Sequence, residues 1–343
     1  MHKRIQYIDI AKGICILLVI LGHELTWDDA ARYFIYSFHI PMFFALSGVT
    51  MRLTHECEKT KKDFILKNVT GILFPYLEMS MLYFLWDLIS WLASGKLSFH
   101  LIALDFGQIV TGYGINVLWF LSTLFFAKLI FYQLVRGSKK NNSIIGMLMI
   151  FVTGNVLLIV VPYLLCEFPA NLVGRYIEWG LISILRPVIA VFFLGFGYYG
   201  YPLFENRRKN RGMSISLLAL SICLIPVFLQ GKITLVNMVS NPFFMVFLTG
   251  TSGTTAVLMA CSLLEGCRYL SRLLTYFGKN SLIIMLTHEY IPVRAFIQKS
   301  VEQVINNYFL QILVTFFAIV VVEALICKLW GIYRVYWRRI IKA

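Results

Sequence analysis

Charged residues are scarce in this chain of 343 residues. Only 14% are Asp, Glu, Lys or Arg, whereas 59% are hydrophobic and the mean hydropathy is +0.76. Soluble globular domains carry about a quarter charged residues, so this scarcity excludes an ordinary soluble enzyme. We therefore expect an all-α fold, a polytopic transmembrane helix bundle that forms one integral-membrane domain over residues 1–343.

Acidic residues are fewer than basic ones, with 17 Asp and Glu against 31 Lys and Arg, which gives a net charge of +14. A basic patch of the kind that binds nucleic acid is missing, because the basic residues lie in short loops between apolar stretches. That distribution excludes nucleic acid as a partner and favours the anionic head groups of membrane lipids.

Motifs for metal binding and for a serine nucleophile are also missing. The seven cysteines are scattered without a C-x-x-C pair or a His/Cys cluster at zinc spacing, so we expect free thiols and no metal. No G-x-S-x-G elbow is present. We find no convincing internal repeat, which disfavours the many transporters built from duplicated halves. The basic, apolar start has no small-x-small cleavage site, which predicts a retained first span.

Long apolar runs are abundant. A span needs about 20 mostly apolar residues. Most Lys and Arg residues fall in alternate loops, which predicts that both termini are cytoplasmic in the cell membrane. We expect an outer interfacial or re-entrant piece at 97–112 and an outer amphipathic helix at 294–307. About ten spans are predicted, at 8–25, 34–51, 70–93, 115–135, 143–165, 179–201, 213–230, 243–264, 281–297 and 308–328.

Two histidines lie within the first two apolar runs. At a rise of about 1.5 Å per residue, His23 is roughly 22 Å from the inner face. The second run starts outside, so His39 lies about 8 Å below the outer surface, with Pro41 able to kink the helix beside it. Ionisable groups within the membrane are costly, so this shared depth predicts a site, with two helix-end histidines of purely structural role as the alternative.

Two charged residues flank His23 on the same predicted helix. Lys12 lies eleven residues earlier on the same face, where it meets a phosphate from the inside or snorkels at the interface beside Asp9. Glu24 points about 100° away from His23 around the helix, and we assign it to substrate binding.

Later spans add further polar groups. Trp119 opens the fourth, and Arg186 lies in the sixth, where it pairs with an acid or binds an anionic substrate. The span at 281–297 places His288 about 10 Å from the cytoplasmic side. We assign all three to substrate binding, with a structural pairing as the alternative for the two ionisable ones.

Several of these stretches resemble the membrane acyltransferase-3 family. The run I-D-I-A-K-G-I-C-I-L-L-V-I-L-G-H at 8–23 is similar to its first-helix signature, and F-H-I-P-M-F-F-A-L-S-G at 38–48 to its second. Weaker similarities follow in order over nearly the whole chain, at 119–121, 192–197 and 278–288.

The resemblance implies transfer of an acyl group, usually acetyl, from cytoplasmic acyl-CoA to a hydroxyl of a carbohydrate or lipid-linked glycan. It implies that His23 is catalytic, as proton acceptor or as acyl carrier, and that Lys12 lies near CoA. We assign His39 to the same catalytic site because of its similar depth. The family often has paired arginines after the second helix, where this chain offers Lys61, Lys62 and Lys67, which bind phosphate without a bidentate fork.

This reading predicts a tunnel from Lys12 at the inner mouth to His23 near the outer end, about 16 Å along the helix. The alternative is a transporter or flippase for a sugar or an organic acid, in which the intramembrane histidines and Arg186 relay protons and hold substrate.

Overall fold

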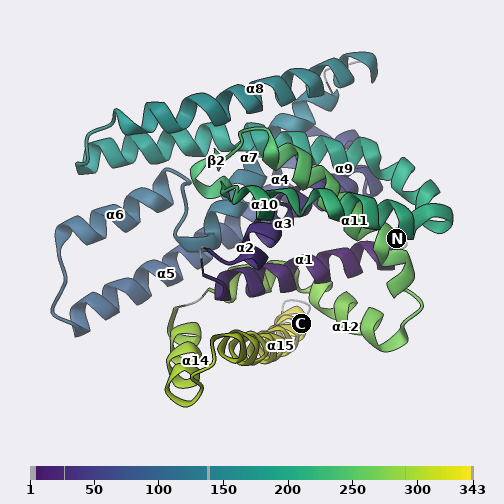
Figure 1. Ribbon diagram of the computed structural model, residues 1–343. Helices are drawn as coiled ribbons and strands as arrows, with labels where there is room; N and C mark the ends of the chain where they lie inside the picture. The colour runs from purple at the N-terminus through teal and green to yellow at the C-terminus, as the bar shows by residue number, and fades with distance from the viewer. Residues whose placement is uncertain (1–4, 27, 137–139, 290, 341–343) are drawn as a thin grey trace.

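The computed structural model describes residues 5–26, 28–136, 140–289 and 291–340, and it is a helical bundle (Figure 1). The strands found in these ranges are two residues long, β1 (Ile233–Thr234) and β2 (Val239–Ser240), paired antiparallel. The α-helices are α1 Gln6–Glu24, α2 Ala30–Tyr36, α3 His39–Leu53, α4 Lys61–Asn68, α5 Phe74–Ala93, α6 Phe99–Val110, α7 Trp119–Arg136, α8 Lys140–Cys166, α9 Leu172–Ile222, α10 Ile225–Leu229, α11 Met245–Leu264, α12 Arg268–Lys279, α13 Ser281–Thr287, α14 Ile291–Val304 and α15 Tyr308–Ile340.

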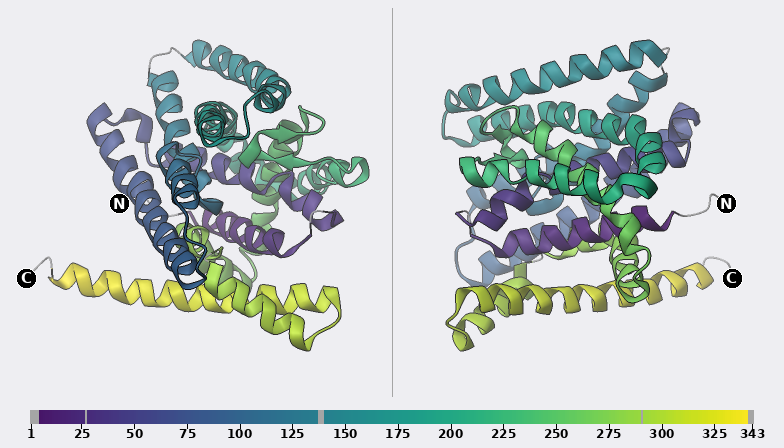
Figure 2. Two further views of the ribbon diagram at one scale, coloured as in Figure 1. Left: turned by 90° about the vertical axis from the view of Figure 1, so that its left-hand side faces the viewer. Right: turned by 45° about the vertical axis from the view of Figure 1, so that its right-hand side comes forward.

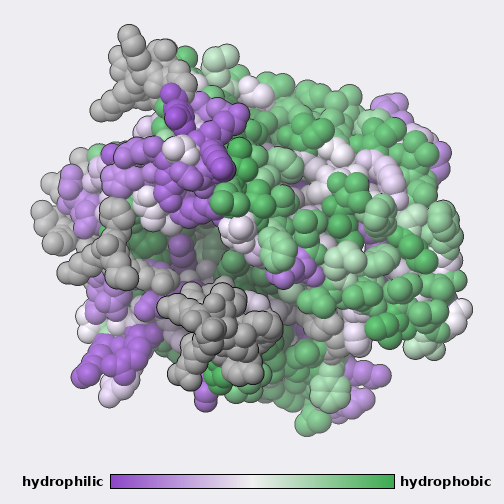
Figure 3. Space-filling view, turned by 180° about the vertical axis from the view of Figure 1, so that it is seen from behind, coloured by the Kyte–Doolittle hydropathy of each residue, from purple (hydrophilic) through white to green (hydrophobic). Residues whose placement is uncertain are grey.

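Seven described segments are long and apolar enough to cross a membrane, which confirms the predicted polytopic helical fold. Shorter apolar helices at Met213–Leu229 and Met245–Cys261 correspond to the seventh and eighth predicted spans. The third short apolar helix, α6, falls where we predicted a re-entrant or interfacial piece. Figure 3 shows a broad apolar surface with hydrophilic residues gathered toward one end, and Figure 2 shows that α1 begins and α15 finishes toward the same end.

The helix α9 contains two predicted spans and reverses direction between them. Phe193 stacks on Phe247 of α11 at 5.8 Å, and Cys223, thirty residues later, donates to the carbonyl oxygen of Thr249. A straight helix would separate Phe193 and Cys223 by about 45 Å, so both reach neighbouring positions of α11 only because the chain turns back.

Glycines let the central helices approach closely. A β-carbon at Gly48 of α3 would collide with the carbonyl of Leu194 in α9, and one at Gly13 of α1 would collide with Leu274 in α12. Small residues at such crossings let the helix backbones approach closely. Close packing matters in a membrane because no hydrophobic force drives the helices together. These contacts fix α1 and α3, the two histidine-bearing helices, within the bundle.

The ninth predicted span, 281–297, is wrong in its position. Helix α12 packs along α1. Helix α13 follows α12 and is only seven residues long, because the helix ends at Thr287, just before His288. Helix α14 then starts at Ile291, close to the amphipathic helix predicted at 294–307. A count of apolar residues missed the break, because Ile291, Pro292 and Val293 extend the apolar run past it.

Candidate functional site

His23 lies at the carboxyl end of α1 and faces the break between α13 and α14. Its Nδ1 is 3.0 Å from Oε1 of Glu289, whose side chain is 13% exposed. A carboxylate only accepts hydrogen bonds, so Nδ1–H donates and the other ring nitrogen, Nε2, keeps its lone pair. This tautomer is the one needed to accept a proton from a substrate.

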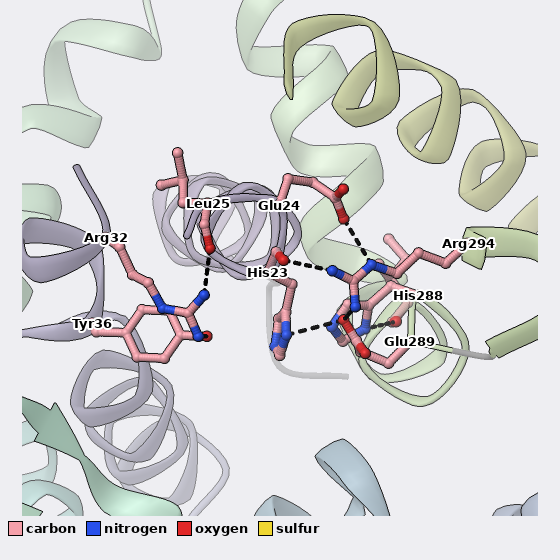
Figure 4. A network of polar contacts seen from close by, with 9 residues as sticks. His23, Glu24, Leu25, Arg32, Tyr36, His288, Glu289 and Arg294 are labelled. Atoms are coloured by element: carbon pink, nitrogen blue, oxygen red, sulfur yellow. Dashed lines mark hydrogen bonds and ion pairs between the residues drawn. The ribbon is translucent and has the colours of Figure 1, made fainter. Parts of the chain in front are cut away.

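Arg294 of α14 holds this pair in place (Figure 4). Its Nη1 donates to Oε1 of Glu289 at 2.6 Å, and its Nη2 donates to the backbone oxygen of His23 at 2.5 Å. Its Nε donates to Oε1 of Glu24 at 2.9 Å, so Glu24 reaches the site through Arg294. The guanidinium thus joins the end of α1 to α14 and orients the carboxylate that orients the imidazole.

His288 packs against His23, with ring centroids 5.3 Å apart. It is 3% exposed, and its Nδ1–H donates to the backbone oxygen of Ile284 at 2.8 Å. The predicted depth of His288, near the cytoplasmic side, is therefore wrong, because His288 lies level with His23. The prediction started the ninth span at residue 281, whereas the chain already runs alongside α1 in α12.

His39 opens α3 at a similar depth, as predicted. It is 3% exposed, its Nδ1–H donates to the backbone oxygen of Ile35 at 2.8 Å, and its ring lies 4.8 Å from that of Tyr36. His23 and His39 line one cavity of about 270 Å³. Its other lining residues are Val19, Arg32, Tyr36, Ile40, Asn116, Val117, Trp119, Phe120, Ile233, Thr234, Leu235, Val236, Met285 and Glu289.

Arg186 is not among the residues that line this cavity. It is 2% exposed, and its Nε donates to Oγ1 of Thr123 at 2.7 Å and its Nη1 to the backbone oxygen of Val236 at 3.1 Å. Its Nη2 lies 3.3 to 3.5 Å from the carbonyl oxygens of Gly112, Tyr113 and Trp119, and its guanidinium stacks over the Trp119 ring at 4.7 Å. The arginine thus holds the loop between α6 and α7, which contributes Asn116 to the cavity, and the first residue of α7, Trp119, which lines the cavity too.

A second cavity of about 690 Å³ lies at the other end of α1. Lys12 lines it and donates to Oγ1 of Thr50 at 3.2 Å. Arg52 and His55 line it too, together with Ile5, Ile8, Asp9, Leu53, Thr54 and Tyr201. We call it the inner cavity, because it lies toward the end of α1 that the sequence predicts to be cytoplasmic, and we call the cavity beside His23 the outer cavity. Lys12 and Arg52 give the inner cavity a basic character that suits phosphate groups.

The three lysines predicted beside Lys12 are not among the lining residues of this inner cavity. Lys61 and Lys62 are exposed on α4. Lys67 pairs with Oε1 of Glu56 at 2.5 Å, while Lys128 pairs with Oε2 at 2.9 Å. Burial raises the pKa of Glu56, but the charges of Lys128 and Lys67 outweigh it and hold that pKa at about 2. Lys67 therefore neutralises a buried carboxylate near the surface.

The outer and inner cavities share no lining residue among those described. Cys15 and Ile16, which lie between Lys12 and His23 on α1, have no exposed surface, and Leu46 of α3 is equally buried. Cys15 donates to the backbone oxygen of His39 at 3.0 Å, so α1 and α3 are in contact there. The predicted tunnel is therefore two separate cavities in this structure.

Sequence reasoning missed Glu289, Arg294 and Arg52 as site residues. Glu289 follows His288 directly, and both Glu289 and Arg294 lie within the span predicted at 281–297. Arg52 directly follows the span predicted at 34–51. The signal that could have found Arg294 is its cost: an arginine inside a predicted span needs an acid partner, and Glu289 precedes it by five residues.

A model of a protein family described as an acyltransferase domain matches residues 5–328, essentially the whole chain. No curated protein and no solved structure matches the chain. The matched range includes both cavities and the His23–Glu289–Arg294 network.

Proposed function

Because the chain belongs to the acyltransferase-3 family of membrane acyltransferases, we propose that it moves an acetyl group from cytoplasmic acyl-CoA to a hydroxyl of a carbohydrate or lipid-linked glycan in the cell membrane. The observation that carries this proposal is the contact of His23 Nδ1 with the Glu289 carboxylate, at the wall of a cavity next to a helix end. Family membership favours this reaction over transport of a sugar or an organic acid.

His23 is the general base in the proposed mechanism. Its Nε2 accepts the hydroxyl proton as the acceptor oxygen attacks the thioester carbonyl, the new C–O bond forms, and the C–S bond breaks. The proton then passes from the imidazolium to the departing CoA thiolate. Transfer through an acyl-histidine uses the same nitrogen as nucleophile and stays open as a variant of this proposal.

Glu289 is the positioning residue for this base. Its carboxylate holds the Nδ1–H tautomer of His23 and stabilises the imidazolium that forms during proton transfer. Arg294 keeps the carboxylate ionised and aimed, and Glu24 balances the charge of Arg294. His39 adds a neutral imidazole to the cavity wall.

The acceptor occupies the outer cavity. Trp119, Phe120 and Tyr36 give it aromatic walls, on which the apolar face of a sugar ring can stack. Arg186 supports this wall, because its Nη2 contacts the backbone oxygen of Trp119 at the start of α7. His288 supports His23 from behind, at ring-contact distance.

The donor occupies the inner cavity, with CoA phosphates near Lys12 and Arg52 and the exposed Lys61 and Lys62 attracting the nucleotide from solution. The eleven residues from Lys12 to His23 span about 16 Å, a distance that an extended pantetheine arm can bridge. The reaction then requires α1 and α3 to separate around Cys15, and we include that opening in the proposal.

The test is transfer of labelled acetyl from acetyl-CoA to surface glycans in membranes that carry His23→Ala, with the exposed His100→Ala as matched control. Loss of a general base costs about 10²–10⁴-fold in rate. We expect that loss for His23→Ala and wild-type transfer for the control. Full transfer by His23→Ala would refute the role, and sugar uptake into proteoliposomes without an acyl donor would support a transporter instead.

A further inference from the structure

The cluster around His23 contains three side chains that can each offer one ligand atom to a metal ion. These atoms, from His23, His288 and Glu289, all lie within 4.8 Å of one another. Two imidazoles and one carboxylate form the donor set of many three-ligand zinc sites, which keep a fourth position open. Here the outer cavity, which His23 and Glu289 line, supplies that open side.

His288 gives an independent sign of a ligand. Its residue is 3% exposed, and its Nδ1–H is fixed by the backbone oxygen of Ile284. The lone pair therefore resides on Nε2, and that atom is buried with no hydrogen-bond partner among the described residues. An imidazole held by a backbone carbonyl at one nitrogen with the other left bare is the arrangement seen in metal-ligating histidines.

We propose that His23, His288 and Glu289 bind a divalent transition ion of the zinc class, and that the bound ion inhibits acyl transfer. The inhibition rests on the proposed function, because an ion held by His23 and Glu289 disrupts the pair that prepares the base. Small side-chain shifts suffice, since ligand atoms around zinc lie about 3–4 Å apart when each bond is about 2.1 Å.

Arg294 sets the expected strength of this site. Its guanidinium contacts Oε1 of Glu289 at 2.6 Å and so places a positive charge beside the ion. A second cation there weakens binding relative to a structural zinc site. The ion therefore binds reversibly, and a chelator removes it. In this it resembles an inhibitor and differs from a structural metal ion, whose removal unfolds the protein.

The experiment measures zinc binding by the full-length protein in detergent, after treatment with a chelator, by isothermal titration with ZnCl₂. Cobalt absorption in the visible range reports the ligand set independently. We expect one ion per chain for the wild type and for the surface control His100→Ala. His288→Ala and Glu289→Gln should each bind zinc at least tenfold more weakly than the wild type. If His288→Ala does not fold, Glu289→Gln still tests the site, because it keeps the shape of the side chain.

Zinc binding that is absent, or equal in wild type and both variants, would overturn the site. Acetyl transfer measured in the same preparation separates this result from the proposed function. Active chelated protein that zinc does not inhibit would leave the proposed function standing and overturn the inhibition. Stoichiometric zinc binding by a chain inactive with every acceptor would support the site while the proposed function fails.

Discussion

Arg186 is buried and Arg294 is half-buried, and the two arginines meet the same electrostatic cost in opposite ways. Arg186 is surrounded by neutral acceptors, the hydroxyl of Thr123 and the carbonyls of the loop between α6 and α7. Arg294 is surrounded by two carboxylates and the end of α1. Arg186 uses its charge to hold backbone carbonyl groups in place. Arg294 uses its charge to position the carboxylates of Glu24 and Glu289 beside the His23 ring. An intramembrane cation therefore indicates a reactive site only when its partners are themselves ionisable.

Arg186→Leu should have the largest effect, because it tests whether Arg186 stabilises the fold. Removing the guanidinium takes away the donor that Arg186 provides to the carbonyl oxygens of Val236 and Tyr113, and each unsatisfied group costs about 1–3 kcal/mol. We expect a loss of about 3 kcal/mol or more, seen as a lower thermal unfolding midpoint in detergent, with Arg186→Lys intermediate. An unchanged midpoint would show that the loop is held by other contacts.

Glu289→Gln tests the other arginine's partner. The amide oxygen can still accept from Nδ1 of His23, so the geometry is kept while the negative charge is lost. We expect kcat for acetyl transfer to fall about 10²-fold with KM for the acceptor nearly constant, since the charge matters most when the imidazolium forms. A rise in KM with constant kcat would instead make Glu289 a binding residue.

Arg294→Lys is a milder change. An ammonium group keeps the charge but cannot reach Glu24, Glu289 and the backbone of His23 together as the forked guanidinium does. We expect about a tenfold loss of kcat and an unfolding midpoint within a few degrees of wild type. If Arg294→Lys unfolds as readily as Arg186→Leu, the two arginines do not differ in the way proposed here.

Glu24→Gln should have the smallest effect. Arg294 retains Glu289, and Glu24 touches the imidazole only through that guanidinium. We expect a two- to fivefold loss of kcat, because Arg294 keeps its contacts with Glu289 and with the backbone oxygen of His23. The measurement is the same acetyl-transfer assay, and a loss as large as that of Glu289→Gln would place Glu24 in direct contact with the reaction.

Much of the helical architecture was predictable, because bilayer thickness sets the length of an apolar run. His23 and His39 could be placed at one depth for the same reason, and both line the outer cavity. The position of His288 could not be predicted, since it depends on where α13 ends. The role of Arg186 was equally hidden, because its partners are mainly backbone carbonyls of a loop, which no residue type marks.

The network beside the outer cavity joins residues that are far apart in the sequence, because Arg294 lies 271 residues after His23 and Glu289 precedes Arg294 by five. A ribosome must therefore deliver nearly the entire bundle to the membrane before an aligned imidazole exists. Chains stalled after α11 already contain both amino-terminal histidines but lack Glu289 and Arg294. Under the proposed function, such incomplete products lack the carboxylate that orients the base.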